Sequence, residues 1–105
     1  MQFAHQAPVK VAVLSTPTEN SSIPLWEQQL SAGAACMNLL LATHAAGFVG
    51  SWLTGWPAYN GAVLASLGGA PTDRIAGFLF LGSPSRPLEE RPRPAYEAVV
   101  STWKG

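Results

Sequence analysis

The feature that most constrains the fold is a long stretch, residues 26–46, that contains no proline and is apolar on nearly every side. An unbroken run of this kind predicts one long helix. A helix without a polar face has to lie inside a core or between subunits. Small residues at positions 32–36 favour close packing against another helix, with Gly33 at the contact, since a glycine costs up to about 1 kcal/mol inside a helix unless a contact compensates.

Residues 30–47, which largely coincide with this stretch, are the one candidate for a membrane-spanning segment. Asn38, Thr43 and His44 interrupt it, and its length lies at the short end of the roughly 20 apolar residues that such a helix needs. We therefore predict a buried helix and no membrane contact. The lone Cys36 and the absence of a secretion signal from residues 1–6 indicate a cytoplasmic protein.

Charge is sparse along the chain. Charged residues make up 11% of the 105 residues, and six basic side chains balance six acidic ones. Zero net charge argues against a nucleic-acid partner, which a protein grips with a basic surface. So few charges leave large apolar patches on a monomer of this size. We expect a single domain that needs a partner chain or a missing half.

Two apolar runs predict strands, at residues 9–15 and 75–82, and the second is typical of a central strand covered on both faces. Between them we expect an extended segment at 48–55 and a short helix at 60–67 that begins at the N-cap Asn60. Residues 84–105 follow as an extended proline-rich arm that ends in a short helix or strand. These elements are typical of part of a larger sheet, so the chain is either a fragment or assembles with copies of itself.

Side-chain catalysis has little support. Cys36 and His44 would lie roughly 12 Å apart along a helix, too far to share a proton, and the motifs GxSxG and HExxH are absent. A cofactor would therefore have to carry any chemistry. In residues 50–57, glycines allow close approach, and Trp52 and Trp56 offer flat faces that suit a planar heterocycle. The alternative, favoured on pattern alone, is that both tryptophans fill the core.

Four blocks of sequence, residues 23–35, 47–48, 52–55 and 74–84, stand in an order that resembles the C-terminal half of the nitroreductase family. The closest likeness is to its small bacterial NAD(P)H nitroreductase branch, and it covers about residues 8–100. The resemblance implies an α+β fold with a long buried helix at a homodimer core and strands of a central antiparallel sheet. It also implies FMN at the subunit interface, NADH or NADPH as hydride donor, and a small-molecule electron acceptor such as a nitroaromatic or a quinone.

The resemblance further implies site residues, which fall into two groups. The residues expected to contact FMN are Trp52, Leu53, Thr54 and Gly55, with Arg91 and Arg93 for its phosphate. The residues expected to meet the nicotinamide nucleotide are Ala42, Thr43, His44, Ala45, Ala46 and Gly47. For the two arginines, a solvated proline-rich arm is an equal alternative.

One part of the family pattern has no counterpart here, namely the Arg-Arg-Ser segment that clasps the FMN phosphate. Two hypotheses therefore remain open. The first is an FMN-dependent oxidoreductase, truncated or completed by another polypeptide. The second is a non-catalytic oligomerisation module or an inactive remnant of the fold. The sequence identifies neither the electron acceptor nor the choice between NADH and NADPH.

Overall fold

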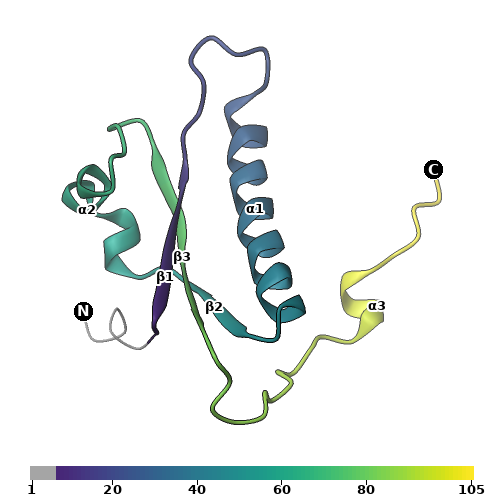
Figure 1. The fold of residues 1–105 in the computed structure, drawn as a ribbon. Helices are drawn as coiled ribbons and strands as arrows, with labels where there is room; N and C mark the ends of the chain where they lie inside the picture. The colour runs from purple at the N-terminus through teal and green to yellow at the C-terminus, as the bar shows by residue number, and fades with distance from the viewer. Residues whose placement is uncertain (1–6) are drawn as a thin grey trace.

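A three-stranded antiparallel sheet with one long helix forms the body of the protein (Figure 1). The computed structural model describes residues 7–105. The interpretation of residues 1–6 as lacking a secretion signal lies outside this part. The elements in chain order are β1 (Val9–Ser15), α1 (Leu25–Ala45), β2 (Val49–Leu53), the 3-10 turn η2 (Trp56–Tyr59), α2 (Gly61–Ser66), β3 (Arg74–Gly82) and α3 (Tyr96–Val99).

The sheet has the order β1-β3-β2, so β3 is the central strand, as predicted. Its apolar residues are covered on both faces, and Leu79 is completely buried. Helix α1 packs against one face of the sheet, and η2 and α2 lie on the opposite side (Figure 1). Antiparallel strands with helices on either side make an α+β fold, which confirms the predicted fold class.

Helix α1 begins and ends within one residue of its predicted bounds. It starts directly after Pro24, whose rigid backbone cannot continue a helix backwards. At the other end, Gly47 adopts a φ of 90°, and the Phe48 N–H donates to the Thr43 carbonyl while the Gly47 N–H donates to that of His44. This is the Schellman arrangement, in which a glycine takes the left-handed position. Gly47 therefore ends the helix, as predicted.

The chain itself covers only one side of α1. The helix buries Cys36 and Thr43, whereas a second side exposes large apolar side chains. These recur at intervals of four, seven and four residues and therefore share one face. We call this set the α1 stripe: Trp26, Leu30, Met37 and Leu41. Within residues 7–105, no helix is long and apolar enough to cross a membrane.

The helix-on-helix contact predicted at Gly33 stays a prediction; within the chain Gly33 borders a strand residue. A Cβ at Gly33 would lie 3.9 Å from Cη2 of Trp52, a residue of β2, so this position faces the chain's own sheet. The small residue allows a large indole to fit between helix and strand.

Helix α2 begins at Asn60, as predicted. The Asn60 side-chain oxygen accepts hydrogen bonds from the backbone N–H groups of Ala62 and Val63, at 2.9 and 3.1 Å. The η2 turn just before it was not predicted. Its signal was the Trp56-Pro57 pair, since proline is favoured in the first turn of a helix.

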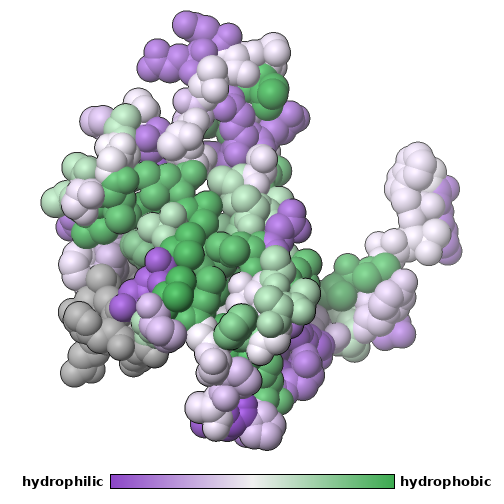
Figure 2. Space-filling model, in the orientation of Figure 1, coloured by the Kyte–Doolittle hydropathy of each residue, from purple (hydrophilic) through white to green (hydrophobic). Residues whose placement is uncertain are grey.

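The last part of the chain, residues 83–105, is exposed throughout and extends away from the sheet (Figure 1). It forms the single helical turn α3, and Trp103 beyond that turn is 88% exposed. Figure 2 shows hydrophobic residues gathered over the strands on one face of the body and again at α3. The arm therefore carries apolar side chains that the rest of the chain does not cover.

Candidate functional site

Trp52 lies at the centre of the predicted flavin segment, and its side chain is turned toward α1. Its Nε1–H donates to the Ala76 carbonyl at 3.1 Å. The register between β1 and β3 passes from Val13↔Gly77 to Leu14↔Ile75 and so skips Ala76, as a β-bulge does. The indole thus satisfies a carbonyl at the irregular point of the central strand.

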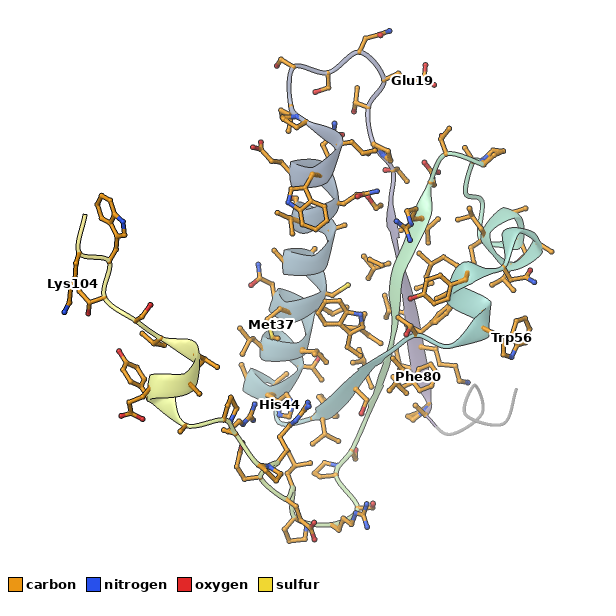
Figure 3. The ribbon with its side chains drawn as sticks, turned by 180° about the vertical axis from the view of Figure 1, so that it is seen from behind. Glu19, Met37, His44, Trp56, Phe80 and Lys104 are labelled. Atoms are coloured by element: carbon orange, nitrogen blue, oxygen red, sulfur yellow. The ribbon has the colours of Figure 1, made fainter. Side chains whose placement is uncertain are left out.

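The residues on either side of Trp52 face the opposite way. Side chains alternate along a strand, so Ser51 and Leu53 point to the side of the sheet that α1 does not cover. Ser51 pairs with Phe80 across the sheet, and Figure 3 shows Phe80 and Trp56 on the far side from α1. The two tryptophans of the segment therefore have different environments: Trp52 packs between sheet and helix, and Trp56 is 63% exposed.

The turn that follows β2 is open. Leu53 is 41% exposed, and Thr54 and Gly55 are exposed as well. The Thr54 hydroxyl makes no hydrogen bond to any residue from 7 to 105. Gly55 has a φ of 96°, which a side chain would make unfavourable. The turn therefore offers an apolar side chain, a free hydroxyl and a backbone without a Cβ.

A cavity of about 290 Å³ lies beside this turn. It joins the uncovered side of β2 to the end of β3 and the start of the arm. Its lining includes Ser51, Leu53, Phe80, Gly82, Ser83 and Leu88. Leu53 of the predicted flavin segment thus lies at the same cavity as Leu88, three residues before Arg91.

The two arginines predicted for the phosphate are not free to the same degree. The Arg93 guanidinium donates from Nε to the Glu90 carboxylate at 3.0 Å, and both side chains are exposed. Arg91 is also exposed on the arm. Glu90 takes donors of Arg93 Nε and Nη2, so a phosphate would share the guanidinium with Glu90 or displace it from this exposed pair. Both interpretations of the two arginines, a phosphate site and a solvated arm, stay predictions.

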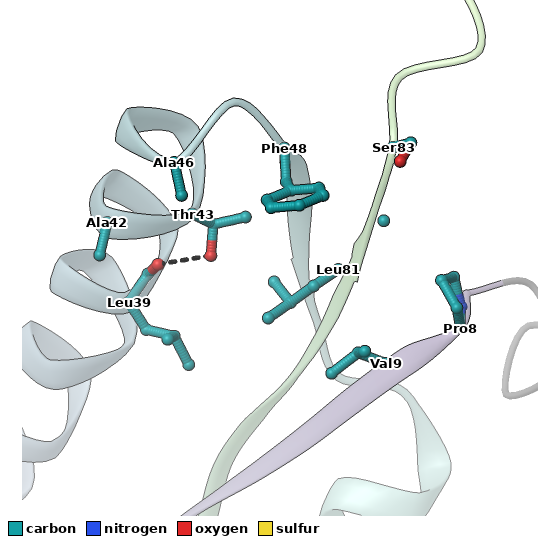
Figure 4. Close-up of a pocket in the computed structure, with 10 residues that line it drawn as sticks. Pro8, Val9, Leu39, Ala42, Thr43, Ala46, Phe48, Leu81 and Ser83 are labelled. Carbon is teal, nitrogen blue, oxygen red and sulfur yellow. Dashed lines mark hydrogen bonds between the residues drawn. The ribbon is translucent and has the colours of Figure 1, made fainter.

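A larger cavity, about 420 Å³, lies at the C-terminal end of α1 (Figure 4). Ala42, Thr43 and Ala46 line it, together with Phe48 and Leu81. The other residues predicted for the nicotinamide nucleotide, His44, Ala45 and Gly47, are not among its lining. The Thr43 hydroxyl donates to the Leu39 carbonyl at 2.7 Å, so the cavity presents almost only apolar atoms.

Comparison with known proteins decides the family. The model of the Nitroreductase family matches residues 1–83. "Putative NAD(P)H nitroreductase YdjA" of Escherichia coli K12 is 39% identical over 79 residues, which are 75% of this chain and 43% of that protein. The chain belongs to the nitroreductase family.

A second relative agrees with this assignment, and a solved structure shows the same fold. "Putative NAD(P)H nitroreductase" of Haemophilus influenzae is 34% identical over 93 residues, 87% of this chain and 50% of that protein. A crystal structure of a nitroreductase-like family protein from Bacillus cereus superimposes with a TM-score of 0.78 at 21% identity, over 91% of this chain and 51% of that one. The chain thus spans about half the length of the relatives it matches.

The residues of this nitroreductase-family chain fit FMN in part. Around the open turn, the Leu53 side chain, the free Thr54 hydroxyl and the Cβ-free Gly55 suit the flat ring and polar rim of a flavin. The FMN phosphate has fewer available donors, because the Arg93 guanidinium is already paired with the Glu90 carboxylate. The sequence analysis did not predict that Ser51, Phe80 and Leu88 line the cavity beside the turn. For Ser51, strand alternation alone would have placed it on the same face as Leu53.

Proposed function

We propose that this chain forms one side of the flavin site of an FMN-dependent NAD(P)H oxidoreductase of the nitroreductase type. The observation that carries the proposal is the open turn after β2, where Leu53 lines a cavity and the next residue, Thr54, has a hydroxyl without a hydrogen-bond partner among residues 7–105. Bound FMN supplies the redox chemistry, taking hydride from NADH or NADPH and passing electrons to a nitroaromatic or quinone-like acceptor. The chain's own residues bind and orient the flavin.

Each residue of the turn has a separate task in this proposal. Leu53 gives an apolar contact for the ring, and the Thr54 hydroxyl donates to or accepts from a polar atom at its edge. Gly55 has no Cβ and therefore lets the backbone approach the ring closely. Its φ of 96° is unfavourable for residues that carry a side chain. In the proposal the nicotinamide nucleotide stays assigned to the C-terminal end of α1, where Ala42, Thr43 and Ala46 line an apolar cavity.

The proposal includes a homodimer. The α1 stripe exposes four large apolar side chains along one helix face, and a second copy of the same stripe would cover them by two-fold symmetry. Such a partner would also bring further groups to the phosphate. In this proposal the oxidoreductase activity requires that the other contacts to FMN, above all those to its phosphate, come from outside this chain.

Titration of the purified chain with FMN tests the proposal. Flavin fluorescence should be quenched on binding, and Thr54→Ala should raise the dissociation constant about three- to tenfold through loss of one hydrogen bond. Thr102→Ala on the exposed arm is the matched control and should leave it unchanged. A folded wild-type chain that leaves flavin fluorescence unaltered at high FMN concentration would contradict the proposal.

A second candidate is a non-catalytic oligomerisation module. The Arg93–Glu90 pair favours it, because Glu90 competes with a phosphate for one of the two expected arginines while the α1 stripe stays available for assembly. A stable dimer that does not take up FMN would support this candidate. A dimer that takes up FMN in proportion to its subunits would exclude it.

A further inference from the structure

We propose that Trp52 is a positioning residue for the turn at residues 53–56, and that its indole anchors this turn instead of stacking on a flavin. The contribution to flavin binding rests on the proposed function. The anchor itself rests on three contacts within the chain and is testable without any flavin.

The first contact is the hydrogen bond from Trp52 Nε1–H to the Ala76 carbonyl, at 3.1 Å. It connects an edge strand to the position in the central strand where the pairing with β1 shifts register. β2 ends one residue later, at Leu53, which forms the last pair with β3, so the indole is fixed next to the point where the chain leaves the sheet for the turn.

The second contact is at Gly77. A Cβ built on Gly77 would lie 2.1 Å from Trp52 Nε1 and 2.4 Å from Cδ1, so the pyrrole end of the indole occupies the space that any other residue's side chain would need. Gly77 therefore acts as the seat of the indole on β3.

The third contact is at the other end of the ring. A Cβ built on Gly33 of α1 would lie 3.9 Å from Cη2, so this end of the ring lies beside the helix. The indole thus spans the gap between the central strand and the long helix, with Gly77 next to its pyrrole end and Gly33 facing its other end. It is still 36% exposed because β2 is an edge strand.

This arrangement separates the roles of neighbouring residues. The Trp52 ring is used inside the chain, on the side of the sheet that α1 covers. Leu53 points to the other side, toward the cavity, and Thr54 follows with its free hydroxyl. We infer that the indole holds the backbone of β2 so that Leu53, Thr54 and Gly55 keep one arrangement.

A double-mutant cycle on the full chain tests the anchor. Gly77→Ala should lower the urea midpoint of unfolding in the wild-type background, because the new methyl group collides with the indole. The same substitution should have a much smaller effect in a Trp52→Leu background, which removes the ring. Gly61→Ala is the matched control, since a Cβ at Gly61 meets nothing within 4 Å. Equal effects of Gly77→Ala in both backgrounds would overturn the anchor.

Two further measurements use Trp52→Phe, which keeps a ring but loses the N–H donor, with Trp103→Phe on the arm as control. Amide hydrogen exchange at residues 53–56 should become faster in Trp52→Phe only. The dissociation constant for FMN should rise about tenfold in Trp52→Phe only. If Gly77→Ala does not fold, recovery of folding in the Trp52→Leu/Gly77→Ala double variant supports the anchor. If the double variant does not fold either, the hydrogen-exchange measurement on Trp52→Phe decides whether the anchor exists.

The outcomes separate the anchor from the proposed function. Unchanged exchange at 53–56 in Trp52→Phe overturns the anchor. Faster exchange with an unchanged FMN dissociation constant overturns the positioning role in flavin binding. A wild type that does not bind FMN overturns the proposed function, while the cycle and the exchange rates still decide the anchor.

Discussion

Gly33 and Gly77 both border the Trp52 indole, but their tolerance to a side chain differs. At Gly77 a Cβ would lie 2.1 Å from the ring, whereas at Gly33 it would lie at 3.9 Å, which is ordinary van der Waals contact. Gly33 also has no positive φ, since it lies within α1. The helix therefore does not need a glycine at this position, and the cost of Gly33 is avoidable.

This difference gives a prediction of increased stability. Gly33→Ala should raise the free energy of unfolding by up to about 1 kcal/mol, because alanine is the better helix former. Gly33→Leu should lower it, because its longer side chain meets the indole. Urea unfolding of both variants measures the effect. A loss of stability in Gly33→Ala would show that helix and sheet lie closer together than described.

Cys36 illustrates a second residue-scale property, the dependence of stability on pH. Burial raises the pKa of its thiol above the ordinary value of 9.0, more than a backbone hydrogen bond lowers it. In the unfolded chain the thiolate therefore forms at a lower pH than in the folded protein. The contribution of the protonated Cys36 thiol to the free energy of unfolding is complete below the pKa of the unfolded state. It is lost as the pH rises through the pKa of the folded state.

We expect the free energy of unfolding to fall more steeply in the wild type than in Cys36→Ala as the pH rises from about 8 to about 10. The difference between the two slopes isolates the contribution of this thiol. Urea unfolding at a series of pH values provides the slopes. Parallel curves would mean that the Cys36 pKa is the same in both states.

At the scale of elements, hydrogen bonds at the helix ends determine where the helices begin and end. Both α1 and α2 end at a glycine with positive φ, Gly47 and Gly68, through the same pair of backbone hydrogen bonds. Only α2 has a side-chain cap at its start, from Asn60. A helix of six residues has few internal hydrogen bonds, so the cap accounts for a large share of its stability.

Replacing Asn60 tests this dependence. Asn60→Ala should lower the free energy of unfolding by about 1 kcal/mol, because two backbone N–H groups lose their acceptor. Asn60→Asp keeps the acceptor and should remain close to the wild type. Equal stability of Asn60→Ala and Asn60→Asp in urea would show that solvent replaces the cap without cost.

On the scale of the whole molecule, residues 7–105 leave apolar surface uncovered in several places, of which two are extended. One is the α1 stripe, and the other is the arm with α3 and Trp103. A chain with 11% charged residues has little polar surface to compensate for this exposure. Both regions therefore point to burial against another chain.

A charge in the α1 stripe should prevent self-association. We expect the wild type to be a dimer at micromolar concentration, and Met37→Glu to raise the dimer dissociation constant at least about tenfold, or about 1.4 kcal/mol. Asn38→Glu adds the same charge to the same helix outside the stripe and should change it less. Size-exclusion chromatography with light scattering measures the masses, and a monomeric wild type would contradict the homodimer.

Local chemistry explains why so much of the fold was predictable. Residues 9–15 and 75–82 form strands because their apolar pattern suits a sheet, and the long proline-free run forms a helix ended by Gly47. These signals act over a few residues, so they are present in the sequence itself. The η2 turn escaped because its single Trp-Pro pair is a weak local signal.

The sequence by itself determined the elements, their ends and the family, because caps, strand patterns and ordered motif blocks are local properties. Only the tertiary structure decided what Trp52 does, because its partners, Ala76, Gly77 and Gly33, lie on other elements and meet it only when the helix packs on the sheet. It likewise joined Leu53 to Leu88 at one cavity. The direction in which a side chain points depends on neighbours distant in sequence, and folding alone brings those neighbours together.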